Sequence, residues 1–512
     1  MTRAAKSTPE RALDVGQVHL VRAQSLDAAG FGLAPLGAIT LAVFDLLPGE
    51  QARVAIEHLS PHRRMAWGSI VSRVGPTADI RTAPACPRFG RCGGCTWQHL
   101  RADMQLEYKR QAVVDALAGA GLDTEVAAAR ASAHQHGYRN KASYVIGRGP
   151  DGLSLGAYAP RSHAFVSTLG CRTVEPVLDR AAAQLRPVLA DSGIAIYDER
   201  ARTGVLRYLI LRSGADGRVL VGLVTTSAAD PATIDALARD IAAQASIPTA
   251  DDEAPVRIAG VVWIRNDSRS GALFDRALPD RGVRPVLGSP HCTESVVGPS
   301  PVVSAADHVV ESAAESAVKI GVEIGIGDFF QVHRAQARAM YAYVVAEAAR
   351  LGPAQGARRR AGVVDLYTGV GGLAFGLAQL GRPVLGVEVI ASAVRAAERA
   401  AARAGLDERV TFRVGDAAEL AAIVAAWGHE PTVIAVNPPR RGLSQRARAA
   451  LSQLAPEVLL YVSCSPTSLA RDLAALVASG FAIDRVQPFD LMPGTPQIET
   501  VVSLHRDRAG AS

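Results

Sequence analysis

The chain has 512 residues, of which 48% are hydrophobic and 20% are charged, and its formal net charge at pH 7 is +6. This length exceeds what one hydrophobic core serves, so we expect about two to four domains, and the apolar content excludes a chain that is disordered throughout. The modest positive charge is compatible with a polyanionic partner. No run reaches the roughly 18 apolar residues of a membrane helix, and the N-terminus lacks the apolar stretch of a signal peptide. We therefore expect a cytoplasmic protein without a membrane partner.

In chain order, residues 1–14 are polar and predict a disordered leader. From residue 15 to 76, short apolar runs alternate with turns that contain Gly or Pro, which predicts a small antiparallel β-barrel. Residues 77–330 combine strand-like runs with helices expected at about 100–120 and 232–244, and predict an α+β central domain.

Strand and helix patterns then alternate regularly from about residue 362 to the end of a fifth strand at residue 465. Each strand is a short apolar run, and the stretches between the strands have helical spacing. This alternation predicts a doubly wound, mostly parallel sheet. We assign residues 331–512 to such a Rossmann-like α/β domain.

A cofactor site is predicted at the carboxyl ends of these strands. The first strand leads into a turn that contains Gly369 and Gly372, where glycine lets the backbone approach a ligand closely. Glu388 ends the second strand, in position to accept hydrogen bonds from ribose hydroxyls. Asp416 follows the third strand, in position to contact an adenine amino group. The turn has alanine in place of the last glycine of the G-x-G-x-x-G pattern, which disfavours a dinucleotide-binding dehydrogenase.

The fourth and fifth strands end in residues that suggest catalysis. Asn437 begins the sequence Asn-Pro-Pro-Arg, whose prolines stiffen a loop where substrates bind in such sheets. Cys464 follows the fifth strand beside a helix start, and a helix N-terminus favours the thiolate. A thiolate can add to C6 of uracil and activate C5, after which a base must remove the C5 proton so that the thiol leaves. Glu499, near the last strands, is a candidate for that base.

Four further cysteines have the ligand count of a metal site. Cys86, Cys92 and Cys95 lie in a Gly- and Pro-rich loop at residues 83–98, and Cys171 lies far downstream. Three clustered ligands and a remote fourth fit an iron–sulfur cluster better than zinc, which usually takes two close cysteine pairs. Zinc is the second hypothesis, and free reduced thiols are the third.

Together these motifs resemble those of the RNA uracil-5-methyltransferase family, in particular its iron–sulfur branch that modifies 23S ribosomal RNA. The resemblance extends over most of the chain and includes Tyr138-Arg-Asn-Lys, Asp328-Phe-Phe-Gln-Val and Tyr461-Val-Ser-Cys-Ser-Pro. It implies a class I methyltransferase fold that uses S-adenosylmethionine, an N-terminal barrel of the OB-like TRAM type and a [4Fe–4S] cluster. It also implies an RNA partner, expected to be 23S ribosomal RNA; we expect no obligate protein partner.

The resemblance also implies roles for individual residues. Cys464 takes the position of the nucleophile and Glu499 takes that of the proton acceptor. The resemblance points to Cys86, Cys92, Cys95 and Cys171 as the iron ligands. The positions that contact S-adenosylmethionine correspond to Gln331, Tyr367, Gly372, Glu388 and Asn437.

Four residues depart from the usual pattern of that family. Asn437 stands where Asp is usual, His333 where Asn is frequent, Gly372 where many members have Asn, and Gln497 where His is common. Two alternatives therefore stay open: a tRNA uridine-5 methyltransferase, and a catalytically degenerate member that binds RNA. An amino-group methyltransferase is less favoured, because Arg440 stands where those enzymes have an aromatic residue after N-P-P.

An enzyme that modifies uracil must bind a flipped or single-stranded base. We consider three aromatic residues as candidates for stacking on bases and three cationic residues as candidates for phosphate contacts. Core packing and ordinary solvation are the alternatives for each. The candidates are Phe329, Phe330, Trp97, Arg139, Lys141 and Arg440.

Overall fold

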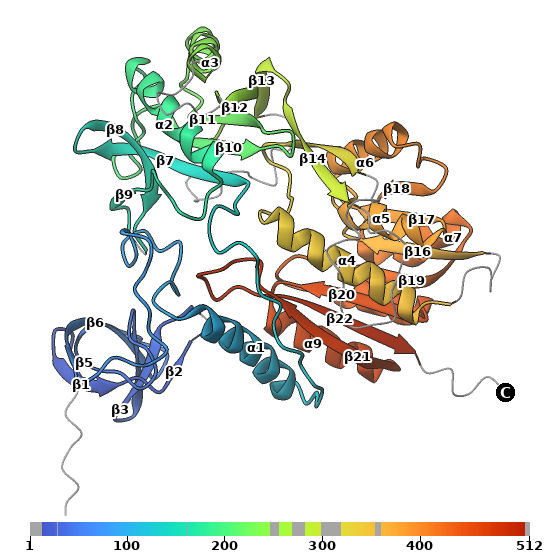
Figure 1. Cartoon of the computed structure of the whole chain (residues 1–512), viewed down its shortest axis with the longest axis horizontal. Coiled ribbons are helices and arrows are strands. Elements are labelled where there is room, and N and C mark those ends of the chain that lie inside the picture. Colours follow the sequence, from blue (N-terminus) through green and yellow to red (C-terminus); the bar gives the residue numbers. More distant parts are fainter. Residues whose placement is uncertain are drawn as a thin grey trace, which may run out of the picture. The chain divides into compact units, whose positions relative to one another are not determined.

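The computed structural model describes residues 13–27, 29–160, 162–245, 255–268, 282–297, 319–353 and 360–506. Most of the expected leader, residues 1–12, lies outside these ranges. The chain forms two compact units (Figure 1): the first comprises Met1–Tyr108 and Gly494–Pro496, and the second comprises Lys109–Pro493 and Gln497–Ser512. The expected domain boundaries at residues 76 and 330 stay predictions.

A six-stranded sheet in the order β1-β5-β6-β4-β3-β2 forms most of the first unit. All neighbouring strands in it are antiparallel except β4 and β6, which are parallel. Alternate side chains from these strands meet in a core that includes Val21, Leu41 and Val54. The strands are β1 (Val18–Arg22), β2 (Ser25–Leu26), β3 (Gly32–Leu36), β4 (Ile39–Val43), β5 (Gln51–Leu59) and β6 (Met65–Val74). The expected β-rich N-terminal region is confirmed, while its assignment to the OB-like TRAM type stays a prediction.

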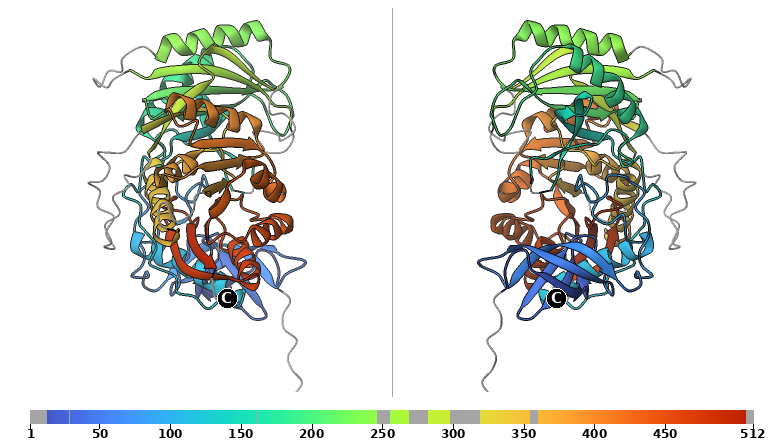
Figure 2. Two further views of the ribbon diagram at one scale, coloured as in Figure 1. Left: turned by 90° about the vertical axis from the view of Figure 1, so that its right-hand side faces the viewer. Right: turned by 90° about the vertical axis from the view of Figure 1, so that its left-hand side faces the viewer.

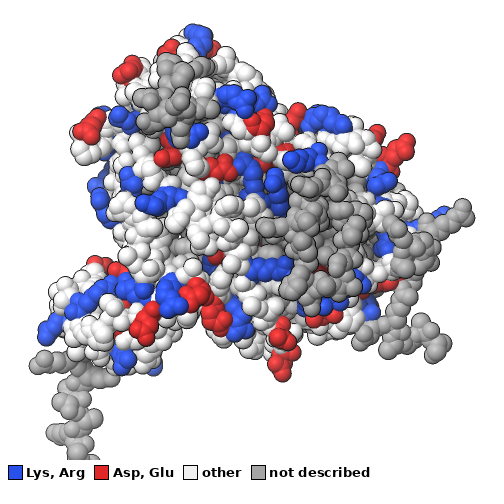
Figure 3. All heavy atoms as spheres, in the orientation of Figure 1, with Lys and Arg blue, Asp and Glu red and all other residues white. Residues whose placement is uncertain are grey.

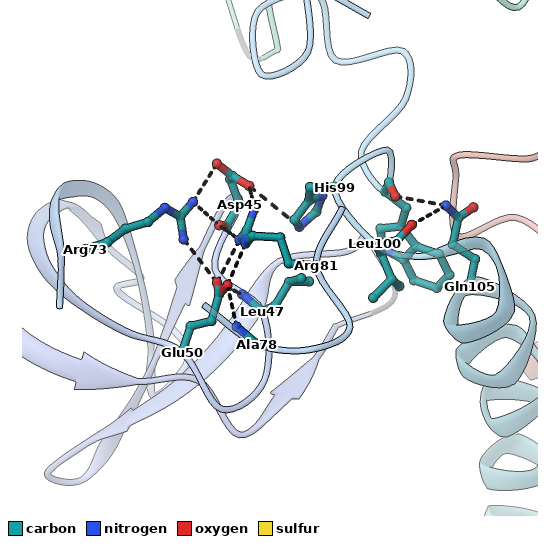
Figure 4. A network of polar contacts seen from close by, with 10 residues as sticks. Asp45, Leu47, Glu50, Arg73, Ala78, Arg81, His99, Leu100 and Gln105 are labelled. Carbon is teal, nitrogen blue, oxygen red and sulfur yellow. Dashed lines mark hydrogen bonds and ion pairs between the residues drawn. The ribbon is translucent and has the colours of Figure 1, made fainter. Parts of the chain in front are cut away.

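A buried carboxylate holds this unit together beside the sheet (Figure 4). Glu50, whose side chain is 3% exposed, accepts hydrogen bonds from Arg81 Nε at 2.5 Å and from the backbone N–H of Leu47 at 2.9 Å. Arg73 also donates to Glu50, at 3.0 Å. Burial opposes ionisation of Glu50, but the hydrogen bonds from Arg81 and Leu47 outweigh it and lower its pKa to about 2. The network ties β5 and β6 to the segment that follows them.

The second unit begins with most of α1 (Ala102–Gly119) and contains a seven-stranded sheet in the order β13-β12-β11-β10-β7-β8-β9. Helices α2 and α3 pack on one face of this sheet (Figures 1 and 2). The expected helices at about 100–120 and 232–244 are confirmed as α1 and α3. The other elements are β7 (Lys141–Gly149), β8 (Gly152–Tyr158), β9 (Phe165–Ser167), α2 (Pro176–Asp191), β10 (Leu206–Ser213), β11 (Arg218–Thr225), α3 (Pro231–Ala245), β12 (Arg257–Arg265) and β13 (Val283–Gly288).

A two-stranded ribbon, β14 (His291–Val297) and β15 (Lys319–Gly325), precedes the third sheet, whose order is β18-β17-β16-β19-β20-β22-β21. The first five strands of this order are parallel to one another, and β22 runs antiparallel to both of its neighbours, β20 and β21. The alternating pattern is therefore confirmed as a doubly wound sheet. The strands are β16 (Ala361–Leu366), β17 (Val384–Glu388), β18 (Val410–Val414), β19 (Glu430–Val436), β20 (Val458–Ser463), β21 (Phe481–Phe489) and β22 (Glu499–Arg506).

Helices cover both faces of this sheet. Side chains from α4, α5 and α6 form the core on one face, and side chains from α7, α8 and α9, with Val113 and Leu117 of α1, form the core on the other. The helices are α4 (Arg334–Leu351), α5 (Gly372–Leu377) with the 3-10 turn η2 (Ala378–Leu380), α6 (Ala391–Arg403), η3 (Ala417–Glu419), α7 (Leu420–Trp427), α8 (Gln445–Leu454) and α9 (Pro466–Ala478). Helix α4 was not predicted, although Met340 and Val344 have helical spacing and are buried.

Two surface properties bear on the expected partners. No helix among the described residues is long and apolar enough to cross a membrane. Acidic and basic side chains are interspersed over the face drawn in Figure 3. On that face, therefore, the positive net charge is not confined to one patch.

Candidate active site

The backbone of the turn after β16 has a shape that lets a ligand approach it closely. Tyr367 and Gly369 have φ angles of 64° and 56°, in the left-handed region that a non-glycine residue rarely adopts. Asp365 is buried and accepts a hydrogen bond from Thr368 Oγ1 at 2.6 Å. Burial raises the pKa of Asp365 to about 7, although the Thr368 hydroxyl lowers it. No atom lies within 4 Å of a Cβ placed on Gly369, so the backbone there faces open space.

Glu388 is fixed at the end of β17. Its two carboxylate oxygens accept hydrogen bonds at 3.1 Å, one from the backbone N–H of Gly369 and the other from that of Ile390. The side chains that follow it, Val389 and Ile390, are 63% and 51% exposed. A carboxylate oriented in this way, beside exposed apolar side chains, suits a ligand with hydroxyl groups and an apolar ring.

Two of the remaining cofactor candidates follow strands of the same sheet, and the third precedes α4. Asp416 is exposed after β18, and its Oδ1 accepts from the backbone N–H of Ala418 at 2.8 Å. Asn437 directly follows β19 and is partly buried. Gln331 is buried just before α4, and its carbonyl accepts from Asn140 Nδ2 at 3.1 Å. Asp416 therefore also caps η3, which restricts its carboxylate.

Cys464 and Glu499 lie on adjacent antiparallel strands. Ser463 at the end of β20 pairs with Thr500 of β22, so the residues next to this pair, Cys464 and Glu499, share one edge of the sheet. The positive charge of Arg440, in the loop after β19, lowers the pKa of both the Cys464 thiol and the Glu499 carboxyl. One cation thus acts on both the candidate nucleophile and the candidate base.

The electrostatics of this trio favour neutral groups before a substrate binds. Burial and the nearby charge of Glu499 raise the pKa of the Cys464 thiol, while Arg440 lowers it. Burial raises the pKa of Glu499 to about 8, again opposed by Arg440. A carboxylate with a pKa near 8 is a stronger base than an exposed one, which suits removal of a proton from carbon.

Sequence reasoning missed the residues that hold the Arg440 loop. Asp472 of α9 is buried and accepts from the backbone N–H of Leu443 and from the Tyr461 hydroxyl, each at 2.7 Å. A Cβ placed on Gly442, whose φ is 73°, would lie 2.3 Å from Asp472 Oδ2. The available signal was Asp472 itself, an acidic residue in the second turn of the helix after Cys464.

Comparison with known proteins assigns this site to a family. Residues 354–507 match the family model described as tRNA (Uracil-5-)-methyltransferase. A relative in Clostridium tetani, named an uncharacterized RNA methyltransferase, is 28% identical over 480 residues, which is 93% of each chain. One of the same description in Halalkalibacterium halodurans is 28% identical over 502 residues, 98% of each chain. The C-terminal part is thus similar to RNA uracil-5-methyltransferases, and nearly the whole chain is similar to RNA methyltransferases. The protein is therefore an RNA methyltransferase.

The fold of this RNA methyltransferase is also similar to a solved structure. The crystal structure of Pyrococcus abyssi tRNA (uracil-54, C5)-methyltransferase in complex with S-adenosyl-L-homocysteine has a TM-score of 0.66 and 22% sequence identity, covering 95% of this chain and 100% of that chain. The likeness confirms the class I methyltransferase fold of the C-terminal part.

The structure describes the surroundings of three of the four departures from the family pattern. His333 is 1% exposed, caps α4 by accepting from the backbone N–H of Gln336, and forms a hydrogen bond of 2.6 Å with Ser132. Its ring stacks on Tyr138 with centroids 4.7 Å apart. Gln497 is exposed, and the space at Gly372 is taken up by Tyr341. We find no explanation in the structure for Asn437 in place of Asp.

The candidates for RNA contacts in this methyltransferase separate by burial. Trp97 is 3% exposed and packs with Leu47 and Leu100, and Phe330 packs against the core under α4, so both fit the packing alternative. Phe329 is 74% exposed and stays a stacking candidate. Lys141 donates to the carbonyl of Ile326 at 2.8 Å.

Of the cationic candidates, Lys141 is thus directed inward, and burial lowers its pKa to about 8. Arg139 is partly buried and forms backbone bridges to Val174 and His333. Arg440 is exposed, so it stays a candidate for a phosphate contact.

The cysteine loop is confirmed as a segment without helix or strand over residues 83–98. Cys86, Cys92 and Cys95 belong to the first unit and Cys171 to the second. All four are partly buried, and none of them forms a disulfide with another described cysteine. Within the described residues, no group of three or more His, Cys, Asp or Glu side chains is placed to hold a metal ion.

Proposed function

We propose that this protein transfers a methyl group from S-adenosylmethionine to C5 of a uridine in RNA through a covalent adduct with Cys464. One observation carries the proposal: a cysteine, a carboxyl with its pKa raised to about 8 and an arginine share the edge where class I methyltransferases bind their substrates. A cysteine that only packs in the core would need neither a nearby arginine that lowers the pKa of its thiol nor a base beside it.

The residues of the sheet edge would hold the cofactor, which supplies the methyl group when bound. Glu388 would accept hydrogen bonds from the ribose hydroxyls, and Asp416 would meet the adenine amino group. The open backbone at Gly369 gives the close approach that such a ligand needs. Gln331, Tyr367, Gly372 and Asn437 complete the proposed set.

Each catalytic group has a defined task in this reaction. The Cys464 sulfur, as thiolate, forms a bond to C6 of the uracil and makes C5 a nucleophile, and Arg440 stabilises that thiolate. After C5 is methylated, Glu499 removes the C5 proton, and the electron pair of that C–H bond re-forms the C5–C6 double bond and expels Cys464. The cysteine is regenerated, so the protein turns over.

For the RNA substrate we propose 23S ribosomal RNA, following the resemblance of the cysteine loop and N-terminal region to the iron–sulfur branch of the family. Transfer RNA is the second candidate. The matching family model is described as a tRNA methyltransferase, and the similar Pyrococcus abyssi protein is named for a tRNA uridine.

We further propose that Cys86, Cys92, Cys95 and Cys171 bind a [4Fe–4S] cluster, with zinc as the alternative. Free thiols, three of them in one irregular loop, are suitable ligands for either. Iron, labile sulfide and zinc would be measured on anaerobically purified protein and on Cys92→Ser and Cys171→Ser. Loss of iron in both variants supports the cluster, whereas iron retained in Cys171→Ser would overturn the four-ligand set. Cys292→Ser, at a buried cysteine outside the set, is the matched control.

The function is tested by methyl transfer to unmodified RNA. Purified protein would receive labelled S-adenosylmethionine with either 23S ribosomal RNA or total tRNA, and the nucleosides would be separated by mass. We expect label in 5-methyluridine, lost in Cys464→Ala and retained in Cys292→Ser. If the protein binds the RNA but no label appears in uridine, the catalytic proposal is wrong and the RNA-binding alternative is favoured.

A further inference from the structure

Tyr341 is a residue of α4 that the proposed reaction does not yet use. Its ring packs against the core between α4 and the C-terminal sheet. A Cβ placed on Gly372 would lie 3.4 Å from Tyr341 Cε2 and 3.7 Å from the Tyr341 hydroxyl oxygen. The phenol therefore occupies the space that a side chain at residue 372 would enter, at the start of the helix after the cofactor turn.

The surroundings of this hydroxyl are acidic, and it lacks a protein partner. The charges of Asp365, which precedes the turn, and of Glu499, the proposed base, both act on the phenol and, with burial, raise its pKa. The group is thus a protonated donor at any pH at which the protein works. None of the described residues hydrogen-bonds to this hydroxyl. The hydroxyl is not among the fully buried groups without a partner, so it reaches accessible surface, where a bound ligand can accept a hydrogen bond from it.

The strand order identifies which part of the ligand reaches Tyr341. From the edge inward the order is β18, β17 and β16. Asp416 follows β18 and is assigned to adenine, while Glu388 ends β17 and is assigned to ribose. The remainder of the same molecule must lie over the turn after β16, which is the turn that Tyr341 covers. That remainder is the amino-acid end, whose carboxylate only accepts hydrogen bonds.

We propose that the Tyr341 hydroxyl donates a hydrogen bond to the amino-acid end of bound S-adenosylmethionine, in the place of a side chain at residue 372. The inference rests on the proposed function only in taking S-adenosylmethionine as the ligand. Tyr341 is then a cofactor-binding residue supplied by a helix that precedes the Gly-rich turn in sequence.

Paired ligands test this assignment. S-adenosylhomocysteine carries the amino-acid end, whereas 5′-methylthioadenosine has the same adenosine and sulfur without it. Their affinities would be measured by calorimetric titration of the full chain, without RNA, for wild type, Tyr341→Phe and Tyr343→Phe. Loss of a hydrogen bond to a charged group predicts that Tyr341→Phe weakens S-adenosylhomocysteine by about tenfold and leaves 5′-methylthioadenosine unchanged. Tyr343, also on α4, packs edge-on against Phe489 instead, so Tyr343→Phe should leave both affinities unchanged.

Equal weakening of both ligands by Tyr341→Phe would overturn the proposal, because the effect would not depend on the amino-acid end. Unchanged affinity for S-adenosylhomocysteine would also overturn it, and would leave Tyr341 as a packing residue or a contact of the uracil. Because these titrations contain no RNA, a wild-type protein that binds S-adenosylhomocysteine but fails to methylate uridine would contradict the proposed function alone.

Discussion

Cys464 and Glu499 stand side by side because Ser463 of β20 and Thr500 of β22 are paired in antiparallel register. The strand that carries Glu499 is the one that breaks the parallel order of the sheet. Because β22 is antiparallel, its first residue, Glu499, lies at the edge of the sheet where the parallel strands have their last residues. The antiparallel insertion therefore brings a base from near the chain end to a nucleophile that lies 35 residues earlier, counting from 464 to 499.

This arrangement predicts that Glu499→Gln separates adduct formation from turnover. Cys464 can still attack C6, but the C5 proton is retained and the thiol cannot leave. We expect 5-methyluridine release to fall by about 10²–10⁴-fold, while a covalent protein–RNA adduct accumulates on denaturing gels. The double variant Cys464→Ala with Glu499→Gln is the control, since it cannot form the adduct. Free release of product by Glu499→Gln would show that another group takes the proton.

Arg440 is expected to control the ionisation of Cys464. Replacing it by methionine removes a positive charge that lowers the pKa of the thiol. We predict that the pH midpoint of Cys464 alkylation by iodoacetamide rises, measured by mass spectrometry of the peptide containing Cys464. Arg441→Met is a matched control, because Arg441 is exposed and contributes its backbone carbonyl to Arg471. An unchanged midpoint in Arg440→Met would remove Arg440 from the mechanism.

The raised pKa of Glu499 predicts how methylation depends on pH. The base must be ionised to accept a proton, and its pKa of about 8 means that the ionised fraction increases about tenfold per pH unit below that value. Turnover should therefore climb from pH 6 to 8. Adduct formation by Glu499→Gln reports Cys464 alone and should keep rising above pH 8. Coincident profiles for the two measurements would assign the observed pKa to the cysteine instead.

The raised pKa of Glu499 also predicts that the stability of the folded protein falls as the pH rises. In the folded state Glu499 holds its proton up to about pH 8, whereas the unfolded chain releases it near the ordinary value of 4.5. The folded state therefore binds more protons between these values, and stability falls as the pH rises through this window. Glu499→Gln should raise the unfolding temperature more at pH 9 than at pH 4.5. An equal change at both pH values would contradict the assignment of the shift to burial of this carboxyl.

Glu50 predicts the opposite pH dependence for the first unit. Its pKa is lowered to about 2, so its contribution to stability is complete above the ordinary value of 4.5 and is lost as the pH falls through about 2. Glu50→Ala removes the shared partner of Arg73 and Arg81, which should cost about 3 kcal/mol of unfolding free energy at pH 7. Calorimetric unfolding of the full chain would measure it. Asp103→Asn, at an exposed ion pair, should leave the unfolding temperature unchanged.

The sequence by itself determined the elements of the C-terminal sheet and the residues that end them. Period and strand–helix alternation are local properties of the chain, so β16 to β20 and the positions of Glu388, Asn437 and Cys464 at their ends could be predicted. The early strands of the first unit were predictable for the same reason. The motifs were also sufficient to indicate the family that the comparisons then confirmed.

Only the tertiary structure decided which residues meet. The register of β22 beside β20, the effect of the Arg440 charge on Cys464 and the position of Tyr341 over Gly372 join segments far apart in sequence. Burial also distinguished candidates for RNA contacts that could not be told apart in sequence. Phe329 is exposed while Phe330 packs in the core, and Lys141 is directed inward to a carbonyl. Periodicity reports which face of an element is apolar, whereas pairing and burial depend on long-range packing that no local pattern encodes.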